Sequence, residues 1–414
     1  MSSTAPLTDT LESVLRFGTL MLRAGDEAFR VHEAMGLIAS SLGIEQLALH
    51  ITVRGMTATA RQGGEHVTLA SEVGSLGIDA WRLGALERLA RDSRPGLTPA
   101  ALATQLDAIE ATGGLRSVLV VSMAVGVASG AFGYLNGGGL VAMLAAVLAG
   151  GVGQALRMLL FRRHLNQYVV TAVCGFAAAG LYYLVARILV QAGLAPDHGV
   201  GIVAAVLFLV PGFPLVAALL DLLQHQTIAG IVRLVYGMVL LLAAAFGLGI
   251  VAALAGFSAG AAPPPSPDNL AVALLCRGIA SALGGCGFAI LYNSSLRTVL
   301  AVGGLALVGN ELRLALHDSG FQLASATFVG ALAVGLLASF AQSRLHEPRI
   351  ALTVPGIIIM VPGAYAFQAV VLFGQGNVIA GLQPAFLATF VVGAMALGLA
   401  TARFVSERKW LLDS

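Results

Sequence analysis

The chain has 414 residues, of which 57% are hydrophobic and only 11% are charged, and its net charge is +2. Soluble domains carry about 25% charged residues, so this composition excludes an ordinary soluble protein and indicates a membrane protein. The small net charge and the lack of a basic stripe give no indication of nucleic-acid binding.

The charged residues are concentrated at the start of the chain. Residues 1–116 contain 10 Arg and 13 Asp or Glu, which is 23 of the 44 charged side chains. This distribution predicts a soluble domain over residues 1–114 and a membrane domain after it. The N-terminus lacks the basic start, apolar core and cleavage site of a signal peptide, so we expect the soluble domain to be cytoplasmic.

The spacing of apolar residues predicts a small α+β fold for the soluble domain. Helices are expected over 11–22, 26–43, 79–92 and 99–112, and strands over 47–53, 56–60 and 66–70. Asp26 is the expected N-cap of the second helix and Thr98 that of the last, where Pro99 suits the first helical position. The sequence "RQGGE" predicts the turn between the last two strands.

The soluble domain carries no motif of an enzyme. Its histidines, His32, His50 and His66, fall on different predicted elements, and no nucleophile elbow or phosphate loop occurs. The three cysteines of the chain lie in apolar runs without metal-ligand spacing, which indicates small core residues. We therefore expect no catalytic residue, cofactor or metal, and a regulatory or gating role for this domain.

Ten later segments are long and apolar enough to span a membrane, which takes about 20 residues. They cover 115–135, 139–158, 167–190, 199–222, 228–255, 268–291, 296–316, 321–341, 350–373 and 378–405. The Pro-rich stretch "AAPPPSPDN" separates the first five from the last five. We expect a first membrane unit at 115–256, a linker at 257–268, a second unit at 269–405 and a cytoplasmic tail at 406–414.

The two membrane units resemble each other in sequence. Val210-Pro211-Gly212 matches Val361-Pro362-Gly363 at an offset of 151, and further matches follow in the same order. These are Ile228-Ala229-Gly230 with Ile379-Ala380-Gly381, Gly247 with Gly398, and Gly153 to Arg157 with Gly309 to Arg313. Because five spans reverse direction, the second repeat is expected to be inverted, an arrangement typical of secondary transporters.

Basic residues are expected on the cytoplasmic side of the spans. With the N-terminus inside, the inner ends and loops carry Arg157, Arg162, Arg163, Arg233, Arg297, Arg344, Arg349, Arg403, Arg408 and Lys409. The outer side carries Arg187 and Arg313. This asymmetry predicts that both termini are cytoplasmic.

Both repeats place Pro-Gly in the middle of an apolar segment, at Pro211-Gly212 and Pro362-Gly363. Proline inside a helix costs about 3 kcal/mol or more, and the carbonyls that it frees need partners in lipid. Broken helices in transporters use such groups to bind substrate near the membrane midplane, although a proline kink that only serves packing is the alternative. Pro214 is expected to break the first segment further, and Pro355 to add a break to the second.

Arg277 and Glu311 lie deep in predicted spans, where an ionisable side chain usually faces a cavity or another charge. They are expected to form an ion pair. In a transport role, Arg277 would bind a substrate carboxylate and Glu311 would carry a proton; an ion pair that only fixes helix packing is the alternative. Asp221 and His225, spaced i and i+4, are expected to share a helix face near the inner mouth and to titrate there.

The repeat also relates two polar pairs. Gln154 and Arg157 are expected near the inner side, and Asn310 and Arg313 toward the outer side, as an inverted repeat requires. They are candidate gates, with snorkelling anchors as the alternative.

Several stretches resemble the threonine/serine exporter family. "FLVPGFPLVAALLDLLQHQTIAGIVRLVYG" resembles that family's first Pro-Gly segment, "LTVPGIIIMVPGAYAF" its second, and "LMLRAGDEAFRVHEAMGLIASSLG" its soluble start. The resemblance covers nearly the whole chain. It implies an inner-membrane exporter of threonine and serine driven by the proton motive force, while relatives split into two chains are associated with succinate export.

Three functions stay open from the sequence. The first is a proton-coupled exporter of small hydroxy amino acids, with protons, a small-molecule substrate and the lipid bilayer as partners. The second is a dicarboxylate exporter of the same fold, and the third is a membrane-anchored sensor or enzyme that acts through its soluble domain. The sequence leaves a homo-oligomer open.

Overall fold

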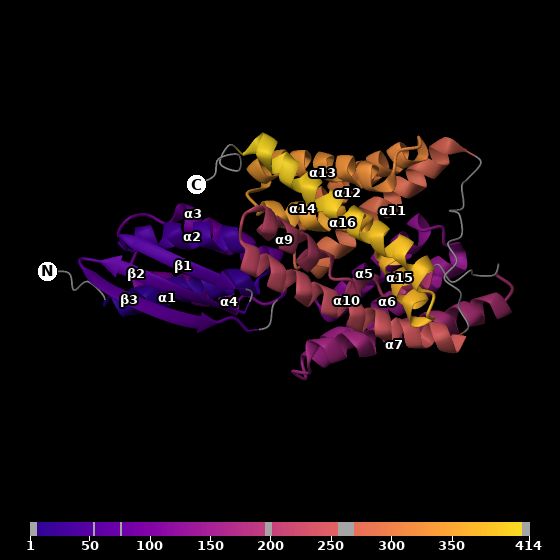
Figure 1. The fold of residues 1–414 in the computed structure, drawn as a ribbon, viewed down its shortest axis with the longest axis horizontal. Helices are drawn as coiled ribbons and strands as arrows, with labels where there is room; N and C mark the ends of the chain where they lie inside the picture. Colours follow the sequence, from indigo (N-terminus) through magenta and orange to yellow (C-terminus); the bar gives the residue numbers. More distant parts are fainter. Residues whose placement is uncertain (1–5, 53, 75–76, 195–200, 256–268, 408–414) are drawn as a thin grey trace.

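The computed structural model describes residues 6–194 except 53, 75 and 76, then residues 201–255 and 269–407. A small α/β unit at the N-terminus lies at one end of a larger helical unit (Figure 1). The expected linker at 257–268 and most of the expected tail at 406–414 fall outside the described residues.

The N-terminal unit has the elements that the sequence predicts. Its helices are α1 (Leu7–Arg23), α2 (Ala28–Ser41), α3 (Ala80–Asp92) and α4 (Pro99–Ala111), and its strands are β1 (Gln46–Thr52), β2 (Gly55–Gln62) and β3 (Glu65–Glu72). The strands form one antiparallel sheet in the order β1-β2-β3, and α1 packs against β2 and β3. Alternate residues of β2 (Met56, Ala58, Ala60) are buried, because one face of the strand meets the helices.

The N-termini of α4 and α2 are capped by different kinds of group. The Thr98 side chain accepts a hydrogen bond from the Ala101 amide at 3.2 Å, as predicted for an N-cap. The expectation for Asp26 is wrong, because α2 begins at Ala28, after Glu27, and neither carboxylate caps it. The group that caps α2 comes from the helical unit, as described below.

The helical unit contains long helices and two short, broken ones. Its elements are α5 (Val118–Leu135), α6 (Leu140–Phe161), α7 (Gln167–Gln191), α8 (Gly201–Ala205), η1 (Leu207–Leu209), α9 (Gly212–Leu223), α10 (Thr227–Ala255), α11 (Leu270–Leu291), α12 (Leu296–Asp318), α13 (Leu323–Leu345), α14 (Arg349–Ile357), η2 (Ile358–Met360), α15 (Gly363–Gly374) and α16 (Val378–Ser406).

Among the described residues, 8 helices are long and apolar enough to cross a membrane, and α14 with α15, bent by 54°, is a ninth candidate. The expected fourth span, 199–222, starts in residues that are not described and continues as the shorter α8, η1 and α9. The chain is thus a multi-pass helical membrane protein with a small α+β domain.

The offset of 151 residues expected from the Pro-Gly motifs also relates the bounds of the last elements in each half. η1 and η2, α9 and α15, and α10 and α16 each have equal lengths, of 3, 12 and 29 residues. The prolines before α9 and α15 have nearly the same conformation, with φ −80° and ψ 52° at Pro211 and φ −80° and ψ 49° at Pro362. Helix α5 packs on α11 and so joins the two halves.

Two further breaks expected from the sequence are absent from the described elements. Pro214 is the third residue of α9, where an amide has no partner within the helix in any case, so the helix accommodates it. Pro355 lies inside α14, which continues to Ile357 before it tightens into η2. The breaks before α9 and α15 therefore lie at Pro211-Gly212 and Pro362-Gly363.

Candidate transport site

The two Pro-Gly breaks lie against each other across the two halves. A methyl group at Gly212 would stand 3.2 Å from Val361 Cγ2, and one at Gly363 would stand 3.6 Å from Val210 Cγ2. Each break has the same local hydrogen bond of 2.8 Å, from Gly212 N to the Val210 carbonyl and from Gly363 N to the Val361 carbonyl. Each break therefore packs against the valine of the other.

A cavity of about 330 Å³ lies beside the first break. That size is at the lower end of the range of about 300–1,000 Å³ typical of small-molecule sites. Its walls include the aromatic and aliphatic residues Phe161, Phe208, Leu209, Val210, Phe213, Leu240 and Leu291, with Pro211 and Pro214 at the break. The polar groups that line it are Arg157, Gln167, Thr171, Arg233, Tyr236 and Tyr292.

Arg157 reaches the cavity from the last turns of α6. In an unbroken helix the Phe208 carbonyl would accept from the amide of Gly212, but that amide bonds to Val210 instead. Arg157 donates to this freed carbonyl at 3.2 Å, and its guanidinium lies 5.3 Å from the centre of the Phe161 ring. Among the described residues no carboxylate lies within ion-pair distance of Arg157, and its Nε has no hydrogen-bond partner.

Arg233, the other cation at the cavity, is already neutralised. Its Nε lies 3.3 Å from Asp221 Oδ2, and both side chains are buried. Gln167 donates to the Tyr236 hydroxyl on another wall, so that pair contributes polarity without charge. The cavity therefore holds one uncompensated positive charge, that of Arg157.

The N-terminal domain forms part of the cavity wall through Leu22, Gly25, Gly77 and Ile78. Its attachment to the helical unit combines apolar packing with hydrogen bonds. The Ala80 amide donates to the Tyr292 carbonyl at 2.8 Å, and Asn293 Nδ2 donates to Asp79 Oδ1 at 2.9 Å. The domain therefore lies directly over the end of the cavity.

Asp221 and His225 do not share a helix face as expected. Helix α9 ends at Leu223, and His225 has a left-handed φ of 58°, so the i and i+4 geometry is lost. Asp221 instead accepts from the Ala28 amide at 2.8 Å and fills the role of N-cap for α2. A helix of the helical unit thus caps a helix of the N-terminal unit.

The expected pair of Arg277 and Glu311 is also wrong. Arg277 donates to Asp318 Oδ2 at 2.7 Å, near the C-terminal end of α12. Among the described residues, Glu311 Oε1 has no hydrogen-bond partner and no cation within ion-pair distance. The shared depth of the two residues in their predicted spans suggested the pair, but Asp318, two turns further along α12, takes the cation.

The two pairs related by the repeat lie toward opposite ends of the helical unit. Arg157 lies beside the N-terminal domain. Helix α12 begins near that domain, at Leu296. Arg313 lies 17 residues, or about 25 Å, further along α12 and so far from the domain. Asn310 Nδ2 donates to Ser281 Oγ at 2.8 Å and Asn310 Oδ1 accepts from Arg313 at 3.1 Å. Gln154 is buried, and its Oε1 has no hydrogen-bond partner among the described residues.

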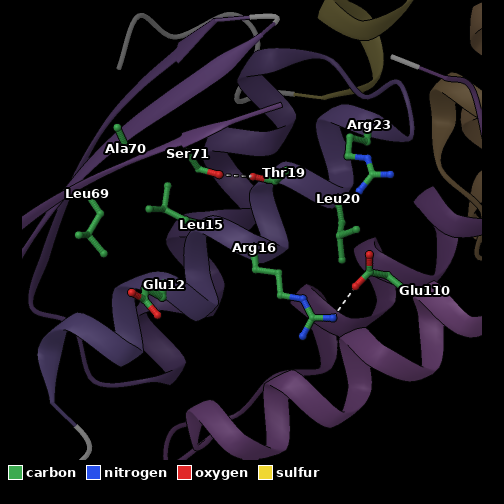
Figure 2. A pocket seen from close by; sticks show the side chains of 10 residues that line it. All are labelled: Glu12, Leu15, Arg16, Thr19, Leu20, Arg23, Leu69, Ala70, Ser71 and Glu110. Carbon is green, nitrogen blue, oxygen red and sulfur yellow. Dashed lines mark hydrogen bonds and ion pairs between the residues drawn. The ribbon is translucent and has the colours of Figure 1, made fainter. Parts of the chain in front are cut away.

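A second cavity, of about 420 Å³, lies in the soluble domain between α1, β3 and α4. Figure 2 shows Arg16 directed at Glu110, and the Thr19 and Ser71 hydroxyls facing each other at 3.3 Å. Arg16 also pairs with Asp107, so two carboxylates compensate its charge. Within the described residues no group of three His, Cys, Asp or Glu could hold a metal. Arg23 and two carboxylates, Glu12 and Glu110, also line this cavity, so its charges are mixed.

Sequence reasoning missed Gln167 and Tyr236 at the cavity, and Asp26, Glu27 and Arg403 at the domain junction. Arg233 and Arg403 served only as markers of the cytoplasmic side. Their partners lie about 200 and 376 residues away in the chain, respectively, so no local pattern could have revealed the contacts. Only the sign of the charges, acidic in the soluble domain and basic at the helix ends, was available as a signal.

Comparisons with known proteins match both halves of the chain to one family. Two family models described as threonine/serine exporter match the chain, ThrE over residues 12–255 and ThrE_2 over residues 277–405. A Mycobacterium tuberculosis protein named "Probable threonine/serine exporter" is 25% identical over 418 residues, which cover 96% of this chain and 76% of the relative. The "Threonine/serine exporter" of Corynebacterium glutamicum is 23% identical over 405 residues, which cover 95% and 81%.

A third relative covers only one half. The Escherichia coli K12 protein named "Probable succinate transporter subunit YjjP" is 24% identical over 235 residues, which cover 56% of this chain and 90% of the relative. No solved structure matches the chain.

Proposed function

Because the chain belongs to the threonine/serine exporter family, we propose that it is a secondary-active exporter of threonine and serine in the inner membrane. The proton motive force drives it, and both termini are cytoplasmic. The single observation that carries the proposal is the lone cation of Arg157 at a broken helix, inside a cavity of the size of a small-molecule site.

Two inverted repeats of five spans would give this exporter alternating access. The equal lengths of the related elements support the repeat, as does the matching backbone at Pro211 and Pro362. The reciprocal contact of Gly212 with Val361 and of Gly363 with Val210 supports an axis between the halves. In this scheme the two broken helices exchange roles as one site opens to either side of the membrane.

The substrate carboxylate would bind Arg157. Helix α9 begins at Gly212 beside the same cavity, and the positive end of its dipole favours an anion there. The hydrogen-bonded pair of Gln167 and Tyr236 is available to a substrate hydroxyl. The substrate ammonium would face carbonyl groups of the broken segment, since a half-helix break leaves carbonyls without helical partners.

A succinate exporter of the same fold is the alternative, and the name of the Escherichia coli relative is its support. The charge of the cavity favours the amino acid. Asp221 neutralises Arg233, so one cation is left, which matches a zwitterion with one carboxylate better than a dicarboxylate. For the coupling proton we propose Glu311, whose Oε1 has no hydrogen-bond partner among the described residues.

The test is transport in proteoliposomes loaded with labelled threonine, with and without a pH gradient. We expect gradient-dependent efflux that an uncoupler abolishes and that unlabelled serine inhibits more than succinate does. Arg157→Gln should lower the rate at least tenfold, while Arg162→Gln, an exposed cation at the end of the same helix, should not. Efflux of succinate but not threonine would overturn the substrate, and full activity of Arg157→Gln would overturn the site.

A further inference from the structure

The turn between α1 and α2 joins both halves of the helical unit. Arg233 of α10 donates to the Asp26 carbonyl at 2.8 Å, and Asp221 of α9 accepts from the Ala28 amide. On the other half, Arg403 of α16 lies 3.3 Å from Glu27 Oε2 and stacks over Phe29. Residues 25–28, which we call the latch, therefore connect α9 and α10 of the first half to α16 of the second.

The latch also forms part of the cavity wall, through Gly25. The backbone there is specific, because Gly25 has φ +101° and a side chain on it would stand 2.8 Å from the Gly77 carbonyl. Glycine is the residue that adopts this conformation without strain. As long as the latch is docked, it covers this end of the cavity and holds the two halves in one relative position.

Each carboxylate in the latch keeps one buried oxygen without a hydrogen-bond partner among the described residues, but Glu27 has an ion pair with Arg403 and Asp26 has none. Asp26 is 1% exposed, its Oδ1 accepts from the Glu27 amide at 3.0 Å, and its Oδ2 has no hydrogen-bond partner among the described residues. An ionised carboxylate that is buried with a free oxygen costs several kcal/mol, whereas a protonated one costs less.

The charges around Asp26 and Glu27 come from every element packed on the latch. They are Arg30 on α2, Glu87 on α3, Asp221 on α9, Arg233 on α10, Arg349 on α14 and Arg403 on α16. Arg30 is bound by Glu87 at 2.8 Å and Arg233 is bound by Asp221, so both cations are shared with other carboxylates. Burial and the charge of Glu87 raise the pKa of Asp26 more than the charge of Arg30 lowers it.

We propose that Asp26 is a proton-binding site and that its protonation locks the soluble domain onto the membrane helices. The role of this lock in export rests on the proposed function, but the lock itself does not. Burial, reinforced by Glu87, raises the pKa of Asp26 well above its ordinary range while the latch is docked. When the latch is released, the carboxyl enters water and its pKa returns to about 4.

The direction of the pH effect follows from these two states. The docked state has the higher pKa, so it holds a proton that the released state has lost. Docking is therefore strongest at low pH and weakens as the pH rises through the docked pKa, by up to about tenfold per pH unit. In a proton-driven exporter, acidification of the cytoplasm would close the site and limit further proton entry.

Hydrogen exchange of the full-length protein in nanodiscs tests the lock without any substrate. At pH values from 5.5 to 8.5, after correction for intrinsic exchange, we expect the protection of residues 24–31 to fall as the pH rises. Asp26→Asn, which imitates the protonated form, should keep high protection throughout. Asp92→Asn, an exposed carboxyl of the same domain, should behave as wild type. Protection of β2 in the same spectra verifies that each variant is folded.

Two results would overturn the proposal: constant protection of the latch across this pH range in wild type, or the wild-type pH dependence in Asp26→Asn. If Asp26→Asn fails to fold, Glu87→Gln replaces it; removing that negative neighbour should move the transition to lower pH, and an unmoved transition would contradict the proposal. A pH-dependent latch in a protein that moves no threonine would refute the proposed function and leave the proton site intact.

Discussion

Removing the charge of Asp221 should destabilise the protein by about 3 kcal/mol. In Asp221→Asn the amide oxygen can still accept from the Ala28 amide, so the change isolates the ion pair with Arg233. At 3.3 Å and an effective dielectric constant of 20, the Coulomb attraction of the pair is about 5 kcal/mol. Breaking one partner of a buried pair typically costs 3–5 kcal/mol, because the remaining charge stays buried.

The lower end of that range applies here, since Arg233 keeps its contact with the Asp26 carbonyl. We expect the midpoint of thermal unfolding in detergent to fall by about 6 °C, at about 2 °C per kcal/mol for a chain of this size. Arg233→Met in the Asp221→Asn background should recover part of the loss, because the orphaned cation is then gone. A double variant as unstable as the sum of both single variants would refute this reasoning, as would a midpoint for Asp221→Asn equal to that of Asp92→Asn.

Three other predictions concern packing and surface charge. Gly247→Ala should lower the unfolding midpoint by several degrees, because the new methyl would collide with the Ala172 carbonyl of α7, while Gly249→Ala, with open space, should be neutral or stabilising. Gly25→Ala should expose residues 24–31 to hydrogen exchange at every pH, because the φ of +101° at Gly25 and the nearby Gly77 carbonyl both exclude a side chain. Unchanged protection of these residues would contradict the view that the backbone of Gly25 holds the latch in place. Arg16→Gln should cost no more than about 1 kcal/mol in thermal unfolding, since its ion pairs are partly exposed, and a larger loss would mean that α4 depends on them.

Local patterns predicted the soluble domain well because its elements depend on neighbouring residues. The alternation over 47–53 became β1, and Gly63 and Gly64 of "RQGGE" form the turn between β2 and β3 with positive φ. The Pro-Gly breaks were also predictable, since the loss of an amide and the clash at proline act within one turn. Long-range contacts were not: no rule of spacing links Glu27 to Arg403 or Asp26 to Arg233.

Errors arose where several partners were compatible with one helix face. Arg277 could meet Glu311 or Asp318, which lie on the same helix, and the packing of α11 on α12 decides for Asp318. The pairing of Asp221 with His225 assumed that α9 continues, but the helix ends two residues before His225. Arg157 and Pro211 were candidates from the sequence because the repeat marked their positions, and both line the cavity.

The capping of α2 by Asp221 has a consequence for biosynthesis. Asp221 is made 193 residues after Ala28, so at about 5–20 residues per second a ribosome needs about 10–40 s to reach it. During that time the Asp221 carboxylate is not available to cap the amides in the first turn of α2. The N-terminal domain lacks this cap until α9 has been made and has reached its place in the helical unit. The start of α2 is therefore completed by a helix made long after it, and the contact of Glu27 with Arg403 of α16 forms later still.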